Sequence, residues 1–206
     1  MPKEALLIVD VQNDFCPGGT LAVPDGDMVV QPLNNMIQLA KDVQMLVVAS
    51  RDWHPPVTSH FNAYGGKWPV HCVHNTWGAK FHPNLLLPSN VIVISKGTEK
   101  NEDAYSAFQG FLDNNGRFLR FSVDEFLRKN GFQKLYIGGL ATDYCVKETV
   151  LDALRLGFEV TVIEDAIRGV EINPGDCERA ISEMKQAGAK FTTTDIILGF
   201  YTPPYE

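Results

Sequence analysis

Short hydrophobic runs rich in β-branched residues recur along the chain and alternate with segments of helical periodicity. Uninterrupted hydrophobicity over four or five residues is typical of strands that are covered on both faces, as in a parallel sheet. Strands are therefore predicted at 5–9, 45–49, 91–94, 135–137 and 160–163, with a weaker one at 190–193.

Helical patterns fill the segments between these runs. Three carry apolar stripes, and a fourth opens with a capping box at 122–125 that Gly131 can close. Pro32 and Pro174 suit first turns, and Gly157 and Gly188 suit helix ends. The stripes are Leu33, Met36, Ile37 and Ala40; Val146, Val150, Ala153 and Leu154; and Cys177, Ala180, Ile181 and Met184.

This alternation of strands and helices predicts an α/β fold. The expected architecture is three-layer and doubly wound, a mainly parallel sheet with helices on both faces, because each parallel crossover needs a covering element. No repeat or interdomain linker interrupts it, so residues 1–206 are expected to form a single domain. Two long segments, 52–90 and 97–121, are predicted as irregular loops, which in compact domains are usually functional.

Composition narrows the partners and the compartment. The chain has 206 residues and a formal net charge of −7, without a Lys/Arg-rich run, so neither nucleic acid nor an anionic membrane surface is expected as a partner. The sequence shows neither a signal peptide nor an apolar run long enough for a membrane span, which predicts a cytoplasmic protein. Its four cysteines are expected to be reduced thiols.

Three reactive side chains stand at the ends of predicted strands, where an open parallel sheet gathers its ligands. Asp10 ends "ALLIVD", Lys96 ends "VIVISK" and Cys145 opens a helix after "KLYIGGLATDYC". Capping by Thr142 or Asp143 would put the thiol in the first turn, where the helix dipole favours thiolate. Taken singly, each of these residues could be an ordinary packing, capping or surface residue. Taken together, they supply a nucleophile, a base and an ammonium group that stabilises negative charge.

Histidines and a carboxylate in the first long loop indicate a metal site. Asp52 and His54 leave one face of an extended segment, and His71 supplies another imidazole from across the loop. His60 is a candidate fourth ligand, although a single loop histidine is more often solvated or hydrogen bonded. His74 and His82 are taken as structural, and Cys16 and Cys72 as packing thiols.

Aromatic residues in the polar loops are candidates for the walls of a substrate pocket. Phe15, Trp68 and Tyr105 lie outside any helix or strand stripe, and a flat apolar substrate would suit such walls. The competing reading is that each packs beneath a loop.

Five ordered segments resemble the isochorismatase-like cysteine hydrolases, and among them the nicotinamidases. They are "LLIVDVQNDFCPGGTLAVPDGD", "VVASRDWHPP", "WPVHCVHNTWGAKFHP", "ISKGTEKNEDAYSAF" and "YIGGLATDYCVKETVLDA", which together span nearly the whole chain. The resemblance implies hydrolysis of nicotinamide to nicotinate and ammonia through a thioester, in NAD salvage. Its small-molecule substrate would be nicotinamide, and a homo-oligomer is compatible with it.

The resemblance also implies roles for individual residues. Asp10, Lys96 and Cys145 match the catalytic triad, and the backbone N–H groups of Ala141 and Cys145 match the oxyanion hole, next to a cis peptide expected at Leu140-Ala141. The remaining matches are Asp52, His54 and His71 as metal ligands, His60 as a ligand in some members, and Phe15, Trp68 and Tyr105 in the substrate pocket.

The sequence leaves alternatives open both for the identity of the metal and for the reaction. One divalent ion is expected, zinc first, with manganese and iron also suited to N/O ligands. The rival reactions are amide hydrolysis of a carbamoyl or ureido substrate by another isochorismatase-like enzyme and, in a different class, a receiver-type signalling module built around a divalent cation.

Overall fold

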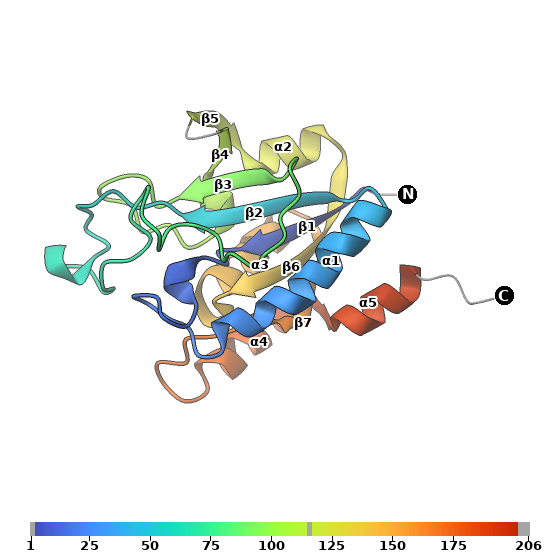
Figure 1. Ribbon diagram of the computed structural model, residues 1–206. Coiled ribbons are helices and arrows are strands. Elements are labelled where there is room, and N and C mark those ends of the chain that lie inside the picture. Colours follow the sequence, from blue (N-terminus) through green and yellow to red (C-terminus); the bar gives the residue numbers. More distant parts are fainter. Residues whose placement is uncertain (1–2, 115–116, 202–206) are drawn as a thin grey trace.

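One eight-stranded sheet runs through the residues described by the computed structural model, 3–114 and 117–201 (Figure 1). The strand order is β5-β4-β3-β2-β1-β6-β7-β8, and every neighbouring pair is parallel except the two that involve β4. The strands are β1 (Lys3–Val9), β2 (Leu46–Asp52), β3 (Ile92–Lys96), β4 (Phe111–Asn114), β5 (Arg117–Ser122), β6 (Phe132–Leu140), β7 (Glu159–Arg168) and β8 (Lys190–Thr192).

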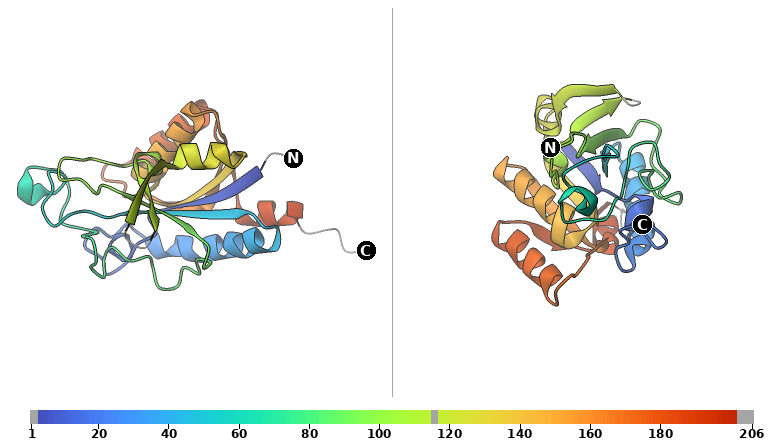
Figure 2. Two further views of the ribbon diagram at one scale, coloured as in Figure 1. Left: turned by 90° about the horizontal axis from the view of Figure 1, so that it is seen from above. Right: turned by 90° about the vertical axis from the view of Figure 1, so that its left-hand side faces the viewer.

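Helices cover both faces of this sheet, as Figure 2 shows with the sheet seen nearly edge-on. One face carries α1 (Val30–Asp42) and α5 (Thr194–Tyr201). The other carries α2 (Val123–Lys129), α3 (Lys147–Arg155) and α4 (Asp176–Gln186). The predicted three-layer, doubly wound α/β architecture is confirmed.

The continuous hydrophobic runs are explained by two separate cores. In β1, Leu6 and Ile8 face the core beneath α1, whereas Ala5, Leu7 and Val9 face the core beneath the other helices. All five are at most 1% exposed, so the strand has no solvent face and needs no polar alternation. The six predicted strands are all present, most of them longer than the runs that predicted them.

The prediction that 97–121 is an irregular loop is partly wrong. Within 97–121 lie β4 and most of β5, which extend the sheet at its edge as an antiparallel hairpin. Both strands are short and mix charged with aromatic residues, so no continuous apolar run marked them. The dipeptide Asn115-Gly116 between them is a strong sequence signal for a tight hairpin.

Helix ends mostly follow the predicted signals. Ser122 and Glu125 form a capping box at α2, and Gly131 has the positive φ of a helix terminator. Pro174 is the exception, because α4 begins only after Gly175 as its N-cap and the proline therefore lies outside the first turn.

The strand order creates a crevice beside β1. From β1 the chain moves outward through β2 to β3, and later returns to place β6 on the other side of β1. The carboxyl ends of β1 and β6 therefore flank the point where the connections diverge, which is the usual binding site of an open α/β sheet. In the described part of the chain, no helix has both the length and the apolar character needed to cross a membrane.

Candidate active site

Three strand ends bring an acid, an amine and a thiol into one buried space. Asp10 follows β1, Lys96 ends β3, and Cys145 lies in a π-helical turn (Thr142–Val146) after β6. Lys96 Nζ is 2.8 Å from Asp10 Oδ2 and 3.4 Å from Cys145 Sγ, and all three residues are buried. The Ser50 hydroxyl donates to Asp10 Oδ1 over 2.7 Å and orients the carboxylate.

Burial controls the ionisation of these groups. It raises the pKa of the Asp10 carboxyl and that of the Cys145 thiol, although the Lys96 ammonium opposes both effects. Burial alone would lower the pKa of Lys96, but Asp10, Asp52 and Cys145 together hold it well above its usual value. Burial therefore opposes the thiolate that a helix start would favour, and the thiol needs a nearby proton acceptor.

The turn that carries Cys145 is not capped as predicted. Its N-cap is Ala141 and it has no side-chain cap; the Asp143 carboxylate instead accepts the N–H groups of Val170 and Glu171, at 2.9 and 2.8 Å. The Leu140-Ala141 peptide bond is cis, as expected. Because N–H groups at a helix start lack partners within the helix, the backbone here can present donors to the crevice.

A second cluster gathers the four predicted metal ligands. Asp52 Oδ2 lies 3.6 Å from His54 Nε2 and 3.7 Å from His71 Nε2. A ring nitrogen from each of His54, His60 and His71 lies within 4.8 Å of those of the other two. All four residues are buried, and His54 Nε2 has no hydrogen-bond partner among the described residues, which is costly for a buried polar atom unless something binds it.

The other nitrogen of each imidazole is occupied. His54 Nδ1 pairs with the Gly97 carbonyl at 2.9 Å, His71 Nδ1 with the Pro69 carbonyl at 2.7 Å, and His60 Nδ1 with the Asp103 carboxylate. Donation from Nδ1 leaves the lone pair on Nε2, the arrangement that metal-binding histidines adopt.

Charge in this cluster also suits a divalent ion. Burial opposes ionisation of Asp52, but the Lys96 ammonium and contacts with His54 and His71 hold its pKa well below the usual range. Burial and the neighbouring His54 lower the pKa of His60, which favours its neutral form. The residues present therefore fit one divalent metal, and a ring nitrogen of His60 lies close enough to those of His54 and His71 to make it a candidate donor.

Other candidate side chains stay outside these clusters. His74 packs against Trp53 and bonds to Asn75, and His82 bonds to the Asn84 backbone. Cys16 is a buried core thiol whose pKa is raised to about 11 by burial, then by Asp27. Burial and Asp52 raise the pKa of the Cys72 thiol well above its usual value.

The three predicted aromatic residues line a small pocket above Cys145. Trp68 Nε1 donates to the Tyr105 hydroxyl over 3.0 Å, and the Phe15 ring lies 5.5 Å from the His71 ring between centroids. The lining residues are Phe15, Leu21, Val23, Asp52, His60, Trp68, His71, Ala104, Tyr105, Leu140, Ala141, Tyr144, Cys145 and Val170.

Tyr144 is a pocket residue that the sequence reasoning missed. Its ring meets Trp68 edge-on at 4.9 Å, and its hydroxyl accepts a 2.8 Å hydrogen bond from the exposed Lys67. Its position next to Cys145 in the sequence was the signal that could have identified it as a pocket residue.

Two polar residues that follow β1 hold the metal-ligand segments and were also missed. The Gln12 amide pairs with both the N–H and the C=O of Asp52, each at 2.8 Å. Asp14 accepts the N–H of Cys72, the residue after His71, over 2.7 Å. Both lie in the quoted "DVQNDF" segment, but no spacing rule reveals which distant backbone a buried side chain will bind.

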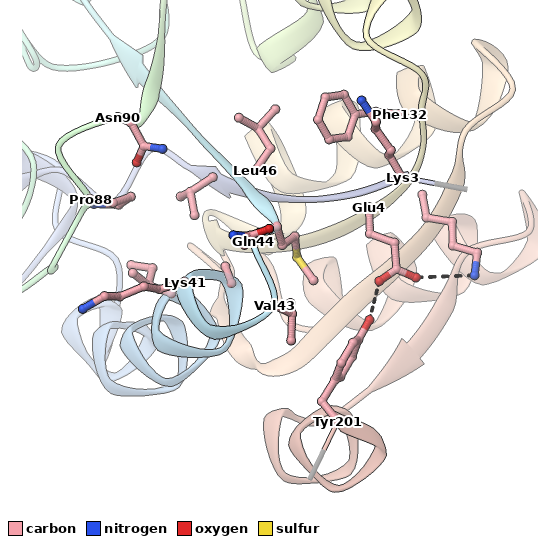
Figure 3. A pocket seen from close by; sticks show the side chains of 15 residues that line it. Lys3, Glu4, Lys41, Val43, Gln44, Leu46, Pro88, Asn90, Phe132 and Tyr201 are labelled. Carbon is pink, nitrogen blue, oxygen red and sulfur yellow. Dashed lines mark hydrogen bonds and ion pairs between the residues drawn. The ribbon is translucent and has the colours of Figure 1, made fainter. Parts of the chain in front are cut away.

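A larger hollow lies elsewhere, at the amino ends of the strands. This groove of about 870 Å³ is bordered by β1, the start of β2 and the end of α5 (Figure 3). Glu4 there accepts a hydrogen bond from Tyr201 and pairs with Lys134 at 3.5 Å. The groove shares no residue with the pocket above Cys145, so the chemistry is assigned to the smaller pocket.

Comparison with known proteins places the chain in a family. The Isochorismatase domain family matches residues 4–196, so the chain belongs to the isochorismatase family of hydrolases and is an enzyme. A nicotinamidase from Escherichia coli (strain K12) is 45% identical over 94% of this chain and 96% of that protein. This confirms the expected family and makes the receiver-type signalling alternative wrong.

Solved structures agree with this placement. A pyrazinamidase of Pyrococcus horikoshii in complex with zinc has a TM-score of 0.84 and 46% identity, covering 93% of this chain and 99% of that chain. PnC1 from L. infantum, in complex with nicotinate, has a TM-score of 0.81 and 32% identity, with 94% of each chain covered.

Proposed function

We propose that this enzyme hydrolyses nicotinamide to nicotinate and ammonia. The observation that carries the proposal is the single constellation in which Cys145 Sγ lies 3.4 Å from Lys96 Nζ, itself 2.8 Å from Asp10, beneath an aromatic pocket bordered by the histidine cluster. Relatives named nicotinamidase, and a relative solved with nicotinate, support the choice of substrate.

In the proposed reaction Asp10 is the proton carrier and Cys145 the nucleophile. Asp10 takes the thiol proton, and the sulfur attacks the amide carbon to form a tetrahedral adduct. Asp10 returns the proton to the departing ammonia, which leaves a thioester. Asp10 then removes a proton from a water molecule that attacks the thioester, releasing nicotinate and regenerating the thiol.

Three further groups stabilise charge in these steps. The Ala141 and Cys145 N–H groups would donate to the oxyanion; removing one such donor typically costs about 3 to 4 kcal/mol. The Lys96 ammonium offsets the negative charge of the thiolate and of Asp10. The raised pKa of Asp10 suits a group that must both accept and return a proton.

Asp52, His54, His60 and His71 would hold the metal. Zinc is the first choice because the donors are three imidazoles and a carboxylate and because a relative was solved with zinc, with manganese and iron as alternatives. When bound, the ion would supply Lewis acidity toward the pyridine nitrogen of the substrate. Phe15, Trp68 and Tyr105 would hold the ring in place.

The wider context belongs to the same proposal. Residues 1–206 would form a single isochorismatase-like hydrolase domain in the cytoplasm, acting in NAD salvage. A self-associated form is compatible with this activity.

Ammonia release from a panel of amides tests the function. We expect nicotinamide to be the best substrate, a chelator to abolish turnover and zinc to restore it. Cys145→Ala should abolish turnover without changing the bound metal, and acid-quenched wild type should carry a nicotinoyl group on Cys145. A preference for carbamoyl or ureido compounds would instead favour the rival amidase, and residual turnover by Cys145→Ala would exclude the thioester.

A further inference from the structure

We infer that Asp143 is a positioning residue that sets one wall of the substrate pocket through the loop at 169–171. This inference rests on the proposed function. Asp143 is 8% exposed and lies in the same turn as Cys145. Its two carboxylate oxygens accept the consecutive N–H groups of Val170 and Glu171, at 2.9 and 2.8 Å.

The loop held in this way contributes directly to the pocket. Val170 lines it together with Ala141, Tyr144 and Cys145. Hydrogen bonds from backbone N–H to a carboxylate are among the stronger ones, and two on adjacent residues fix both position and orientation. Asp143 therefore ties the wall at Val170 to the turn that carries the nucleophile.

A second anchor holds the far side of the same loop. Glu171 has a positive φ of 53°, and its carboxylate accepts the N–H groups of Gly175 and Cys177 at the start of α4. A Cβ at Gly169 would lie 2.0 Å from Cys177 Sγ and 3.0 Å from Asp143 Oδ1, so glycine permits this close approach. The loop is thus fixed between the nucleophile turn and α4.

This arrangement gives the loop a role in substrate selection. Val170 is one of the aliphatic residues that line the pocket, and it is the one that this loop contributes, so the position of the loop affects how much room a ring substituent has. Loosening the loop should weaken substrate binding more than it changes the chemistry at Cys145. Shortening Val170 should admit larger rings.

The test compares Asp143→Asn with Glu171→Gln, which loosens the other anchor by changing a side chain outside the nucleophile turn. Asp152→Asn is the matched control, because its carboxylate lies on α3 and pairs with Arg155. The measurements are kcat and KM for nicotinamide, hydrogen exchange of the 170–171 amides, and the pH profile of Cys145 alkylation by iodoacetamide.

We expect Asp143→Asn to raise KM about tenfold, the effect of losing one strong hydrogen bond, with kcat nearly unchanged. Exchange at 170–171 should accelerate, Glu171→Gln should shift KM in the same direction, and Asp152→Asn should match wild type. Val170→Ala should raise the relative kcat/KM for ring-methylated nicotinamides.

Two results would overturn the inference. Faster loop exchange with an unchanged KM would show that the loop does not shape the pocket. A shifted alkylation profile in Asp143→Asn alone would show that Asp143 acts on the charge of the thiol. Failure of wild type to hydrolyse nicotinamide would count against the proposed function, and the comparison would then be made with the amide that it does hydrolyse.

Discussion

At the scale of single residues, Asp52 links the two halves of the site. One carboxylate oxygen contacts Lys96 Nζ, and the other faces the Nε2 atoms of His54 and His71. Lys96 in turn contacts both Asp10 and Cys145. Removing any member would leave a buried charge without its partner, so the site tolerates few substitutions.

Replacing Lys96 by methionine tests its influence on the nucleophile. The ammonium lowers the pKa of the Cys145 thiol against the dominant effect of burial, so Lys96→Met should move the alkylation profile to higher pH and slow alkylation near pH 7. The loss of a buried ion-pair partner should also cost about 3 to 5 kcal/mol of unfolding free energy. Lys41→Met, at an exposed position on α1, is the control. An unmoved profile would make Lys96 purely structural.

The assignment of His60 is tested by zinc affinity. His60→Ala should weaken binding, and Asp103→Asn, which alters the carboxylate on His60 Nδ1, should weaken it about 10- to 100-fold. His74→Ala is the matched control, because that imidazole contacts Trp53 rather than the cluster. Competition with a chromophoric chelator gives the affinities. Equal affinity for His60→Ala and His74→Ala would remove His60 from the ligand set.

At the scale of elements, the sequence predicted the buried parallel strands and the strand-end chemistry. A strand that is buried on both faces is a continuous apolar run in the sequence, and β1 and β2 could be predicted for this reason. The hairpin of β4 and β5 lacks it because β5 is the edge of the sheet and is partly solvated, with Phe121 51% exposed. Gln12 and Asp14 could not be assigned because their partners are backbone groups 40 and 58 residues away.

The variant Gly78→Ala tests how firmly Asp14, in the segment after β1, holds the loop that follows β2. A Cβ there would lie 1.9 Å from Asp14 Oδ2, whereas one at Gly199 in α5 would meet no atom of the described part of the chain within 4 Å. Gly78→Ala should cost about 1 to 3 kcal/mol through overpacking and weaken zinc binding near His71. Gly199→Ala should stabilise by about 0.5 to 1 kcal/mol through helix propensity.

Urea unfolding of both glycine variants, with zinc titration, separates the two effects. If Gly78→Ala matches wild type in stability and zinc affinity, the Asp14 contact can relax and does not hold the metal-ligand loop.

At the scale of the whole molecule, the two ends of the sheet carry different features. The carboxyl ends of the strands carry the reactive groups, whereas the amino ends carry the groove in Figure 3 and the attachment of α5. Tyr201 donates its hydroxyl to Glu4 and lies 3.4 Å from the Tyr136 hydroxyl. These contacts join the last described helix to β1 and β6, far from Cys145 along the strands.

Tyr201→Phe should therefore lower stability without changing catalysis. Losing a hydrogen bond to a charged acceptor should cost about 1 to 2 kcal/mol, while KM and kcat stay as in wild type. Burial, with the bond to Glu4, raises the pKa of Tyr201. The folded state thus holds this proton more tightly than the unfolded state, so the stabilisation is complete below the ordinary tyrosine pKa of about 10 and is lost as pH rises through the raised value.

Urea midpoints of wild type and Tyr201→Phe, measured from neutral to alkaline pH, should accordingly converge above about pH 10. A constant difference between the two urea midpoints across that pH range would mean that the hydroxyl proton does not stabilise the contact of α5 with β1 and β6. A fall in kcat at neutral pH would mean that the two ends of the sheet are coupled, because the Tyr201 hydroxyl lies against Glu4 and Tyr136, neither of which lines the pocket above Cys145.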